Sequence, residues 1–318
     1  MKIVILEGLS VNPGDLSWEP IEQLGDVTIY DRTTHEQAAE RIEDAQIVLV
    51  NKVPITAEIM DTCPNLRLIC VLATGYNVID CDAARSRGIR VCNVPTYGTN
   101  AVAQFTFSLL LELCNRVGHH DNLVHNGRWC TCPDFCFWDT TQIELAEKTM
   151  GIIGFGKIGK AVGKIAKAFG MNILAYNRSQ SPEGAEIAKY VDLETLLNES
   201  DVISLHCPLT EATQNLINQQ TIAKMKDGVI LINTARGQLL NERDVVAALE
   251  NGKLRAAAVD VASKEPIEKS NPLLTAPNCI ITPHMAWSPV ESRQRIIEIT
   301  AQNIQAYIAG DPIHVVNN

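Results

Sequence analysis

Short hydrophobic runs alternate with amphipathic stretches in residues 1–95. The runs lie at residues 3–6, 27–30, 47–50, 68–71 and 89–92. Helix-like stretches, such as residues 34–43 and 56–63, lie between several of them. Alternating strands and helices are typical of a parallel sheet with helices on both faces. The first part of the chain is therefore predicted to form one α/β domain.

A second series of strands begins after a change in pattern near residue 98. The breaker-rich residues 93–98 precede a long apolar helix predicted over 100–113, and we place the first domain boundary there. Residues 116–148 show little periodicity, and we expect irregular structure that serves function or an oligomer contact. Further strands are predicted at residues 150–153, 172–176, 202–205, 229–233, 256–260 and 279–282. A last helix, predicted over residues 295–309, could return to the first domain. The sequence predicts two doubly wound α/β domains, residues 1–98 with 288–318 and residues 99–287.

The stretch after residue 149 contains the most informative turn. Gly154, Gly156 and Gly159 form a G-x-G-x-x-G pattern between a predicted strand and a helix over residues 158–168. The first glycine allows a tight turn, the second lets a pyrophosphate approach the backbone, and the third lets helix and strand pack closely. The helix N-terminus then offers free N–H groups to phosphates. This half of the chain is predicted to bind a dinucleotide.

Polar residues follow three strands of the second series: Thr234 with Arg236, then Asp260, then His284. Ends of parallel strands meet at one edge of a sheet, so these side chains are expected to face one crevice. In the first half, the small residues Ala73, Thr74 and Gly75 follow a predicted strand. Such a loop either directs backbone N–H groups at an anion or is a plain βα turn, and spacing alone favours neither.

Composition excludes several classes of function. A net charge of −10 argues against nucleic-acid binding, which relies on Lys and Arg at phosphates. No apolar run has the length of a membrane span, and the first residues resemble a strand rather than a signal peptide. We therefore expect a cytoplasmic protein with reduced cysteines. Cys130, Cys132 and Cys136 form the one cysteine cluster; its spacing favours plain thiols over a metal site, and zinc stays the alternative because His125 is nearby.

Several motifs together resemble the D-isomer-specific 2-hydroxyacid dehydrogenase family, and the resemblance covers essentially the whole chain. The motifs are Gly154-Phe-Gly156-Lys-Ile-Gly159, Asn233-Thr-Ala-Arg236-Gly, Val259-Asp260-Val261 with Glu265-Pro266, and Thr282-Pro-His284-Met-Ala-Trp287. The segments 72–77 and 134–139, with Trp287, are similar to the glycerate dehydrogenase (hydroxypyruvate reductase) branch. The resemblance implies an NAD(P)-dependent interconversion of a small 2-keto acid, hydroxypyruvate or glyoxylate, with the D-2-hydroxy acid. It also implies an active site in an inter-domain cleft and a homodimer built on the nucleotide-binding domain.

The resemblance further implies roles for individual residues. Arg236 would hold the substrate carboxylate and polarise the adjacent carbonyl, and His284 would exchange a proton with the carbonyl oxygen. Glu265 would orient the imidazole, and backbone N–H groups of Ala73, Thr74 and Gly75 would hold the carboxylate from the first domain. Implied cofactor contacts are Thr74, Gly154, Gly156, Lys157, Ile158, Gly159, Asn177, Arg178, Ser179, Cys207, Pro208, Thr234, Ala235, Arg236, Asp260, His284 and Ala286.

One departure from the family concerns the cofactor. NAD-specific members carry an acidic residue after the second strand of the nucleotide domain, whereas this chain has Asn177, Arg178 and Ser179. Without the carboxylate a 2′-phosphate is not repelled, and an Arg beside a hydroxyl could bind it, so NADPH use, or use of both cofactors, is favoured. The alternative is that Asn177 still binds the ribose. Two other functions stay open: a dinucleotide-sensing interaction protein resembling a co-repressor, or a formate, phosphoglycerate or D-lactate dehydrogenase.

Overall fold

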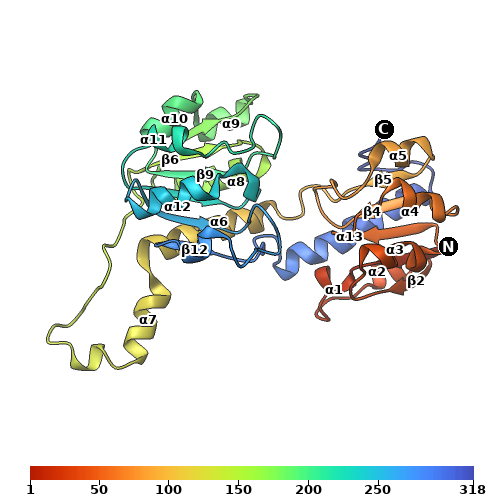
Figure 1. Ribbon diagram of the computed structural model, residues 1–318, viewed down its shortest axis with the longest axis horizontal. Coiled ribbons are helices and arrows are strands. Elements are labelled where there is room, and N and C mark those ends of the chain that lie inside the picture. Colours follow the sequence, from red (N-terminus) through yellow and green to blue (C-terminus); the bar gives the residue numbers. More distant parts are fainter. The chain divides into compact units, whose positions relative to one another are not determined.

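The structure is a computed structural model that describes all residues, Met1 to Asn318. The chain divides into two compact units (Figure 1): unit 1 contains Met1–Gly98 and Trp287–Asn318, and unit 2 contains Thr99–Ala286. Each unit is built on one parallel sheet, which confirms the predicted fold class. Trp287 falls in unit 1, one residue away from the boundary expected from the sequence.

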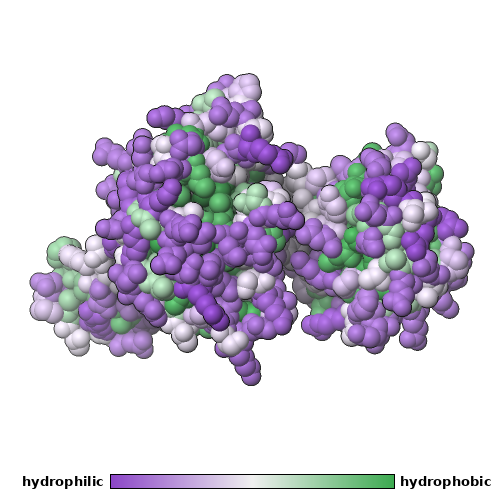
Figure 2. Space-filling view, turned by 45° about the horizontal axis from the view of Figure 1, so that its top comes forward, coloured by the Kyte–Doolittle hydropathy of each residue, from purple (hydrophilic) through white to green (hydrophobic).

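The surface is mostly hydrophilic on the face that Figure 2 displays, where hydrophobic residues form smaller areas among polar ones. No helix combines the length and the apolar character that crossing a membrane would require.

Unit 1 has a five-stranded sheet in the order β2-β1-β3-β4-β5, and all its strand pairs are parallel. The strands are β1 (Lys2–Ile5), β2 (Asp26–Ile29), β3 (Ile47–Val50), β4 (Leu68–Val71) and β5 (Arg90–Cys92). The helices are α1 (Gly8–Val11), α2 (Glu19–Glu22), α3 (His35–Ile42), α4 (Ala57–Thr62), α5 (Cys81–Ser86) and α13 (Val290–Ile308).

Two hydrophobic cores lie on the two faces of this sheet. Side chains alternate between the faces of a strand, so Ile3 and Ile5 enter one core and Val4 enters the other. Residues of α1, α2 and α13 fill the first core, whereas those of α3, α4 and α5 fill the second. Because both faces are covered, the strands are continuous hydrophobic runs, which is why the sequence located them.

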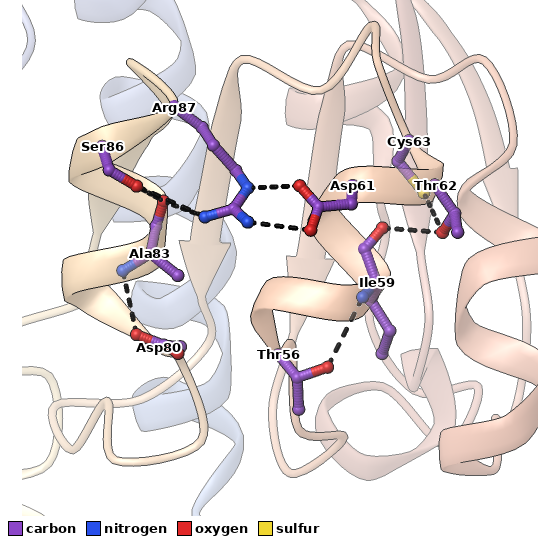
Figure 3. A network of polar contacts seen from close by, with 9 residues as sticks. All are labelled: Thr56, Ile59, Asp61, Thr62, Cys63, Asp80, Ala83, Ser86 and Arg87. Carbon is purple, nitrogen blue, oxygen red and sulfur yellow. Dashed lines mark hydrogen bonds and ion pairs between the residues drawn. The ribbon is translucent and has the colours of Figure 1, made fainter.

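Polar contacts fix the helices and the free edge of unit 1. Asp61 of α4 and Arg87, at the end of α5, form two parallel bonds of 2.7 and 2.9 Å (Figure 3). The tail at Val315 pairs antiparallel with Cys92, and the buried Asn317 side chain bonds the N–H of Val91 in β5 and the carbonyl of Ile89 just before the strand. The tail therefore covers an edge strand that would otherwise expose unpaired backbone groups.

Unit 2 has a seven-stranded sheet in the order β12-β11-β10-β9-β6-β7-β8. The strands are β6 (Thr149–Ile153), β7 (Asn172–Tyr176), β8 (Lys189–Tyr190), β9 (Val202–Leu205), β10 (Val229–Asn233), β11 (Leu254–Val259) and β12 (Cys279–Ile281). The α-helices are α6 (Thr99–Asn115), α7 (Val117–His125), α8 (Lys157–Ala168), α9 (Pro182–Ile187), α10 (Leu193–Glu199), α11 (Gln219–Ala223) and α12 (Glu242–Glu250), and the 3-10 helices are η1 (Trp129–Thr131), η2 (Gly237–Leu239) and η3 (Pro272–Thr275).

The strand order of unit 2 identifies where a ligand can bind. The chain leaves β6 towards β7 and β8 on one side, then crosses to β9 on the other. Ligands of open α/β sheets bind beyond the carboxyl ends of the strands at such a switch point. Helices α6 and α8 pack on one face, and α10, α11 and α12 cover the other.

The prediction of irregular structure over residues 116–148 was wrong in part. Helix α7 and the short η1 lie there, and Figure 1 shows them extending away from the sheet of unit 2. No residue of α7 is buried, so its sequence carries no hydrophobic period from which a helix could be predicted. Strand β8 was not predicted either, because two residues are too short to give a pattern.

Candidate active site

The glycine turn lies at the switch point, between β6 and α8. Gly154 has a φ of +92°, and a Cβ on it would lie 2.3 Å from the backbone nitrogen of Cys207. A Cβ on Gly159 would lie 2.3 Å from the carbonyl oxygen of Gly154, so only glycine lets the helix come this close to the strand. A Cβ on Gly156 would meet no atom within 4 Å, because that residue faces open space.

The first turn of α8 is suited to bind a phosphate. Gly156 is the N-cap residue, and no side chain caps the helix, so the N–H groups at Lys157, Ile158 and Gly159 have no partner from a capping side chain. Free donors, a positive helix end and the open space at Gly156 together fit the pyrophosphate of a nicotinamide dinucleotide. When bound, that cofactor supplies or accepts a hydride.

The residues after β7 border the same turn. The side-chain oxygen of Asn177 accepts a bond from the N–H of Phe155 at 3.2 Å, and its nitrogen donates to the carbonyl of Ser179 at 2.6 Å. Asn177 therefore braces the glycine turn with its side chain. Arg178 and Ser179 are exposed, and the Arg178 guanidinium has no ion-pair or hydrogen-bond partner. This guanidinium is free to bind an anion.

The loop after β9 contacts the glycine turn from the other side. His206 and Cys207 lie against Gly154, and Pro208 follows them. The ring of His206 hydrogen-bonds the hydroxyl of the buried Ser204 at 2.8 Å. Burial lowers the pKa of His206 to about 3. His206 is therefore neutral at physiological pH, and its position beside the glycine turn was not predicted from the sequence.

A histidine with this pKa makes stability depend on pH. An unfolded histidine titrates near about 6.5, so between pH 6.5 and 3 the unfolded chain binds a proton that folded His206 does not. The free energy of unfolding should therefore fall as the pH falls, by about 2 kcal/mol from this residue between pH 7 and 5. We expect a weaker pH dependence in His206→Gln, measured by urea denaturation at both pH values. Equal pH dependence in the two proteins would contradict this account.

Arg236 follows β10 in a turn that the buried Asn233 organises. The Asn233 side chain accepts from the N–H of Ala235 at 3.0 Å and donates to the carbonyl of Arg236 at 2.8 Å. Thr234 contacts the hydroxyl of Thr106 in α6 at 3.2 Å. The sequence motif included Asn233 without a role, and the structure shows that it shapes the turn. Arg236 itself is exposed.

A close backbone contact joins this turn to the loop that contains Glu265. A Cβ on Gly237 would lie 1.9 Å from the carbonyl carbon of Ala262, so only glycine permits the contact. Gln238 adds a bond to the carbonyl of Ser263 at 2.8 Å. Arg236 is thereby held beside the loop of residues 262–265, whose own N–H at Ala262 bonds the carboxylate of Glu265 at 3.2 Å.

His284 and Glu265 form a direct pair. The Nδ1 atom of His284 lies 2.7 Å from Oε2 of Glu265, and both side chains are partly exposed. The bond fixes the ring and leaves Nε2 as the nitrogen that can exchange a proton with a ligand. A carboxylate that orients an imidazole is an arrangement suited to general acid–base catalysis.

Asp260 holds the backbone around His284. Its buried carboxylate accepts bonds from the hydroxyl of Thr282 at 2.6 Å, the N–H of Met285 at 2.9 Å and the N–H of Ala286 at 2.8 Å. His284 lies between these residues with a φ of +53°, a conformation that L residues adopt at a cost. The sequence predicted a cofactor contact for Asp260, and the structure adds this bracing of the histidine loop.

In unit 1, the loop after β4 presents free donors. The hydroxyl of Thr74 bonds the carbonyl of Val94 at 2.9 Å, and the Asn93 side chain bonds the carbonyl of Thr74 at 2.8 Å. The backbone N–H groups of Ala73, Thr74 and Gly75 donate to no protein atom. Between the two readings left open by the sequence, free successive N–H groups favour an anion-binding loop over a plain turn.

The cysteines of the cluster at residues 130–136 are exposed or half-buried thiols. All ten cysteines are free thiols, and no group of His, Cys, Asp or Glu side chains is arranged to hold a metal ion.

Comparisons with known proteins agree with this geometry. Residues 107–286 match the family described as "D-isomer specific 2-hydroxyacid dehydrogenase, NAD binding domain". The chain is 53% identical to a hydroxypyruvate reductase of Blautia hydrogenotrophica over the full length of both, and 40% identical to a glycerate dehydrogenase of Methylorubrum extorquens over 89% of each. A solved D-lactate dehydrogenase of Aquifex aeolicus with NAD and lactic acid has a TM-score of 0.85 and 30% identity, over 100% of this chain and 99% of the other.

Proposed function

Because this chain belongs to the D-isomer-specific 2-hydroxyacid dehydrogenase family, we propose that it interconverts hydroxypyruvate and D-glycerate with a nicotinamide dinucleotide. The observation that carries the proposal is the His284–Glu265 pair, at 2.7 Å, in the same part of unit 2 as the Arg236 turn and the glycine turn. The identity of 53% to a hydroxypyruvate reductase supports the substrate. Glyoxylate is the second candidate substrate, since it shares the 2-keto acid group.

The residues have the following roles in the proposed reaction. Arg236 binds the substrate carboxylate with two parallel N–H groups and polarises the carbonyl next to it. In unit 1, the N–H groups of Ala73, Thr74 and Gly75 are free to bind a carboxylate. His284 gives a proton from Nε2 to the carbonyl oxygen as a hydride reaches the carbonyl carbon, and takes it back in the reverse direction. Glu265 keeps Nδ1 of His284 in a hydrogen bond throughout.

The stereochemistry of the product tests this function. Hydroxypyruvate is incubated with the protein and a reduced nicotinamide dinucleotide, and the glycerate formed is resolved by chiral chromatography. We expect the D enantiomer alone, because one bound orientation exposes one face of the carbonyl to the hydride. L-glycerate or a racemic mixture would contradict the proposal.

We further propose that the protein prefers NADPH. The exposed, unpaired guanidinium of Arg178 and the hydroxyl of Ser179 lie beside the glycine turn, where the ribose of a bound dinucleotide would lie. Asn177 brings no negative charge to this position. A 2′-phosphate would gain a bond to the guanidinium and suffer no repulsion.

Arg178→Ala tests the cofactor preference. We expect the KM for NADPH to rise about tenfold or more, because a charge-assisted hydrogen bond contributes roughly 1.5–3 kcal/mol. The KM for NADH should stay within about twofold, which makes NADH the internal control. A wild-type KM for NADH well below that for NADPH would contradict the preference.

We also propose a homodimer that forms through residues 116–148 of unit 2, the segment with α7 and η1 that extends away from the sheet. Phe135, Trp138, Trp129 and Val117 of this segment are exposed by 89%, 66%, 51% and 64%. Large hydrophobic side chains at such exposure indicate an interaction surface. Light scattering should give the mass of a dimer, and Phe135→Asp with Trp138→Asp should give a monomer.

The alternative functions predict a different catalytic activity. A dinucleotide-sensing protein needs no intact proton donor, whereas His284, Glu265 and Arg236 are all present and braced. Formate and D-lactate dehydrogenase readings predict other preferred substrates.

A further inference from the structure

The carboxylate of Glu7, two residues after the end of β1, is bound by the backbone of a distant loop. One oxygen, Oε2, accepts bonds from the N–H groups of Asn51 at 2.9 Å, Lys52 at 2.6 Å and Val53 at 2.9 Å. Three successive N–H groups that converge on one oxygen form an anion-binding nest. Here the anion is a side chain of the protein itself.

Side chains add to this attachment. The amide of Asn51, which is 7% exposed, donates to the hydroxyl of Ser10 at 3.0 Å. That hydroxyl donates in turn to the carbonyl of Glu7 at 2.8 Å. The loop of residues 51–53 is therefore fixed by both its backbone and its side chains to the residues that follow β1.

This loop lies next to the proposed carboxylate-binding loop. In the sheet order, β3 lies between β1 and β4, and Val50 pairs with Val71. The pairing continues past the strands, because the N–H of Leu72 donates to the carbonyl of Val50 at 2.8 Å. Residues 51–53 therefore leave the sheet beside residues 72–74, so the nest that Glu7 fills and the loop with free N–H groups lie side by side at one edge of unit 1.

The two sets differ in their occupancy and charge. Glu7 fills the first, whereas the N–H groups of Ala73, Thr74 and Gly75 have no protein partner. Lys52 belongs to the first set and is exposed, and its ammonium group makes no ion pair or hydrogen bond. A cation beside free N–H groups attracts a small carboxylate to the free set.

We propose that Glu7 is a positioning residue for substrate binding. Its carboxylate occupies the nest of residues 51–53, so that a 2-keto acid cannot bind there, and it holds Lys52 where the ammonium group contacts the acid bound at residues 73–75. The proposal rests on the proposed function for the identity of the acid. It assigns a role in binding and none in proton or hydride transfer.

Replacement of Glu7 by Ala tests the proposal. We measure hydroxypyruvate binding by calorimetry to the full chain with oxidised nicotinamide dinucleotide, so that no turnover is needed. Glu7→Ala should raise the Kd for hydroxypyruvate about tenfold or more, because a charge-assisted contact to the acid is lost. Acetate at about 50 mM, a carboxylate that fits the vacated nest, should restore most of the affinity relative to the wild type measured in the same acetate, a reference that accounts for competition at residues 73–75. The Kd for the nucleotide should not change.

Controls separate this role from a loss of structure. Glu58→Ala removes an exposed carboxylate of the same unit and should leave binding unchanged. Lys52→Met should raise the Kd as Glu7→Ala does, and the double variant should be no weaker than the worse single one, because both act through one contact. If Glu7→Ala does not fold, the Kd for hydroxypyruvate is compared between the wild type, Glu7→Gln and Lys52→Met, which alter the structure less.

Different results would contradict the role of Glu7 and the proposed reaction. An unchanged Kd in folded Glu7→Ala, or a raised Kd that acetate does not restore, would overturn the role of Glu7. A wild-type protein that binds hydroxypyruvate without reducing it would overturn the proposed reaction and leave this binding role intact.

Discussion

His284→Gln should lower kcat for hydroxypyruvate reduction by about 10²–10⁴, the range over which a positioned proton donor accelerates a reaction. Glutamine can still hydrogen-bond Glu265, but it cannot give a proton to the carbonyl oxygen. The glycine turn at Gly154 and Gly156 is not altered, so nucleotide binding should persist within about threefold. Initial rates and fluorescence titration with NADPH measure the two quantities.

A matched control is His35→Gln, which replaces an exposed histidine in α3 of unit 1. This variant should keep wild-type kcat. Turnover near wild type in His284→Gln would refute the acid–base assignment.

Arg236→Lys should lower kcat/KM by roughly 10–150-fold, the equivalent of losing one charge-assisted bond of about 1.5–3 kcal/mol. Lysine keeps the charge but not the planar pair of donors that binds a carboxylate at two points. The turn itself should survive, because Asn233 holds it through backbone groups alone. Both KM and kcat should change, since the guanidinium also polarises the reacting carbonyl.

The control for this prediction is Arg243→Lys, at an exposed arginine in α12 that makes no ion pair. Kinetics of Arg236→Lys equal to those of the control would show that a fixed guanidinium is not required.

The architecture could be predicted from the sequence because buried parallel strands are hydrophobic on both faces. Runs such as β3 and β4 were located at the bounds that the structure shows. Helix α7 was not predicted, because none of its residues is buried and helix propensity alone is a weak signal. The sequence also located the glycine turn, because steric demands at Gly154 and Gly159 leave no other residue possible.

The contacts that hold the site residues in place could not be predicted, because they join residues that are distant in the sequence. Glu7 binds N–H groups 44 and more residues away, and backbone donors leave no mark on a sequence. Asp260 reaches Met285 and Ala286 across 25 and 26 residues, so its bracing of the His284 loop appears only in the fold. Neutral His206 is a third case, since its pKa follows from burial beside Ser204.

The central claim is that this chain reduces a small 2-keto acid. The most direct test is the initial rate of NADPH oxidation, and separately of NADH oxidation, with hydroxypyruvate, glyoxylate and pyruvate. We predict turnover that is fastest with hydroxypyruvate and NADPH. Tight nucleotide binding without turnover of any of the three acids would contradict the claim and favour a dinucleotide-sensing protein.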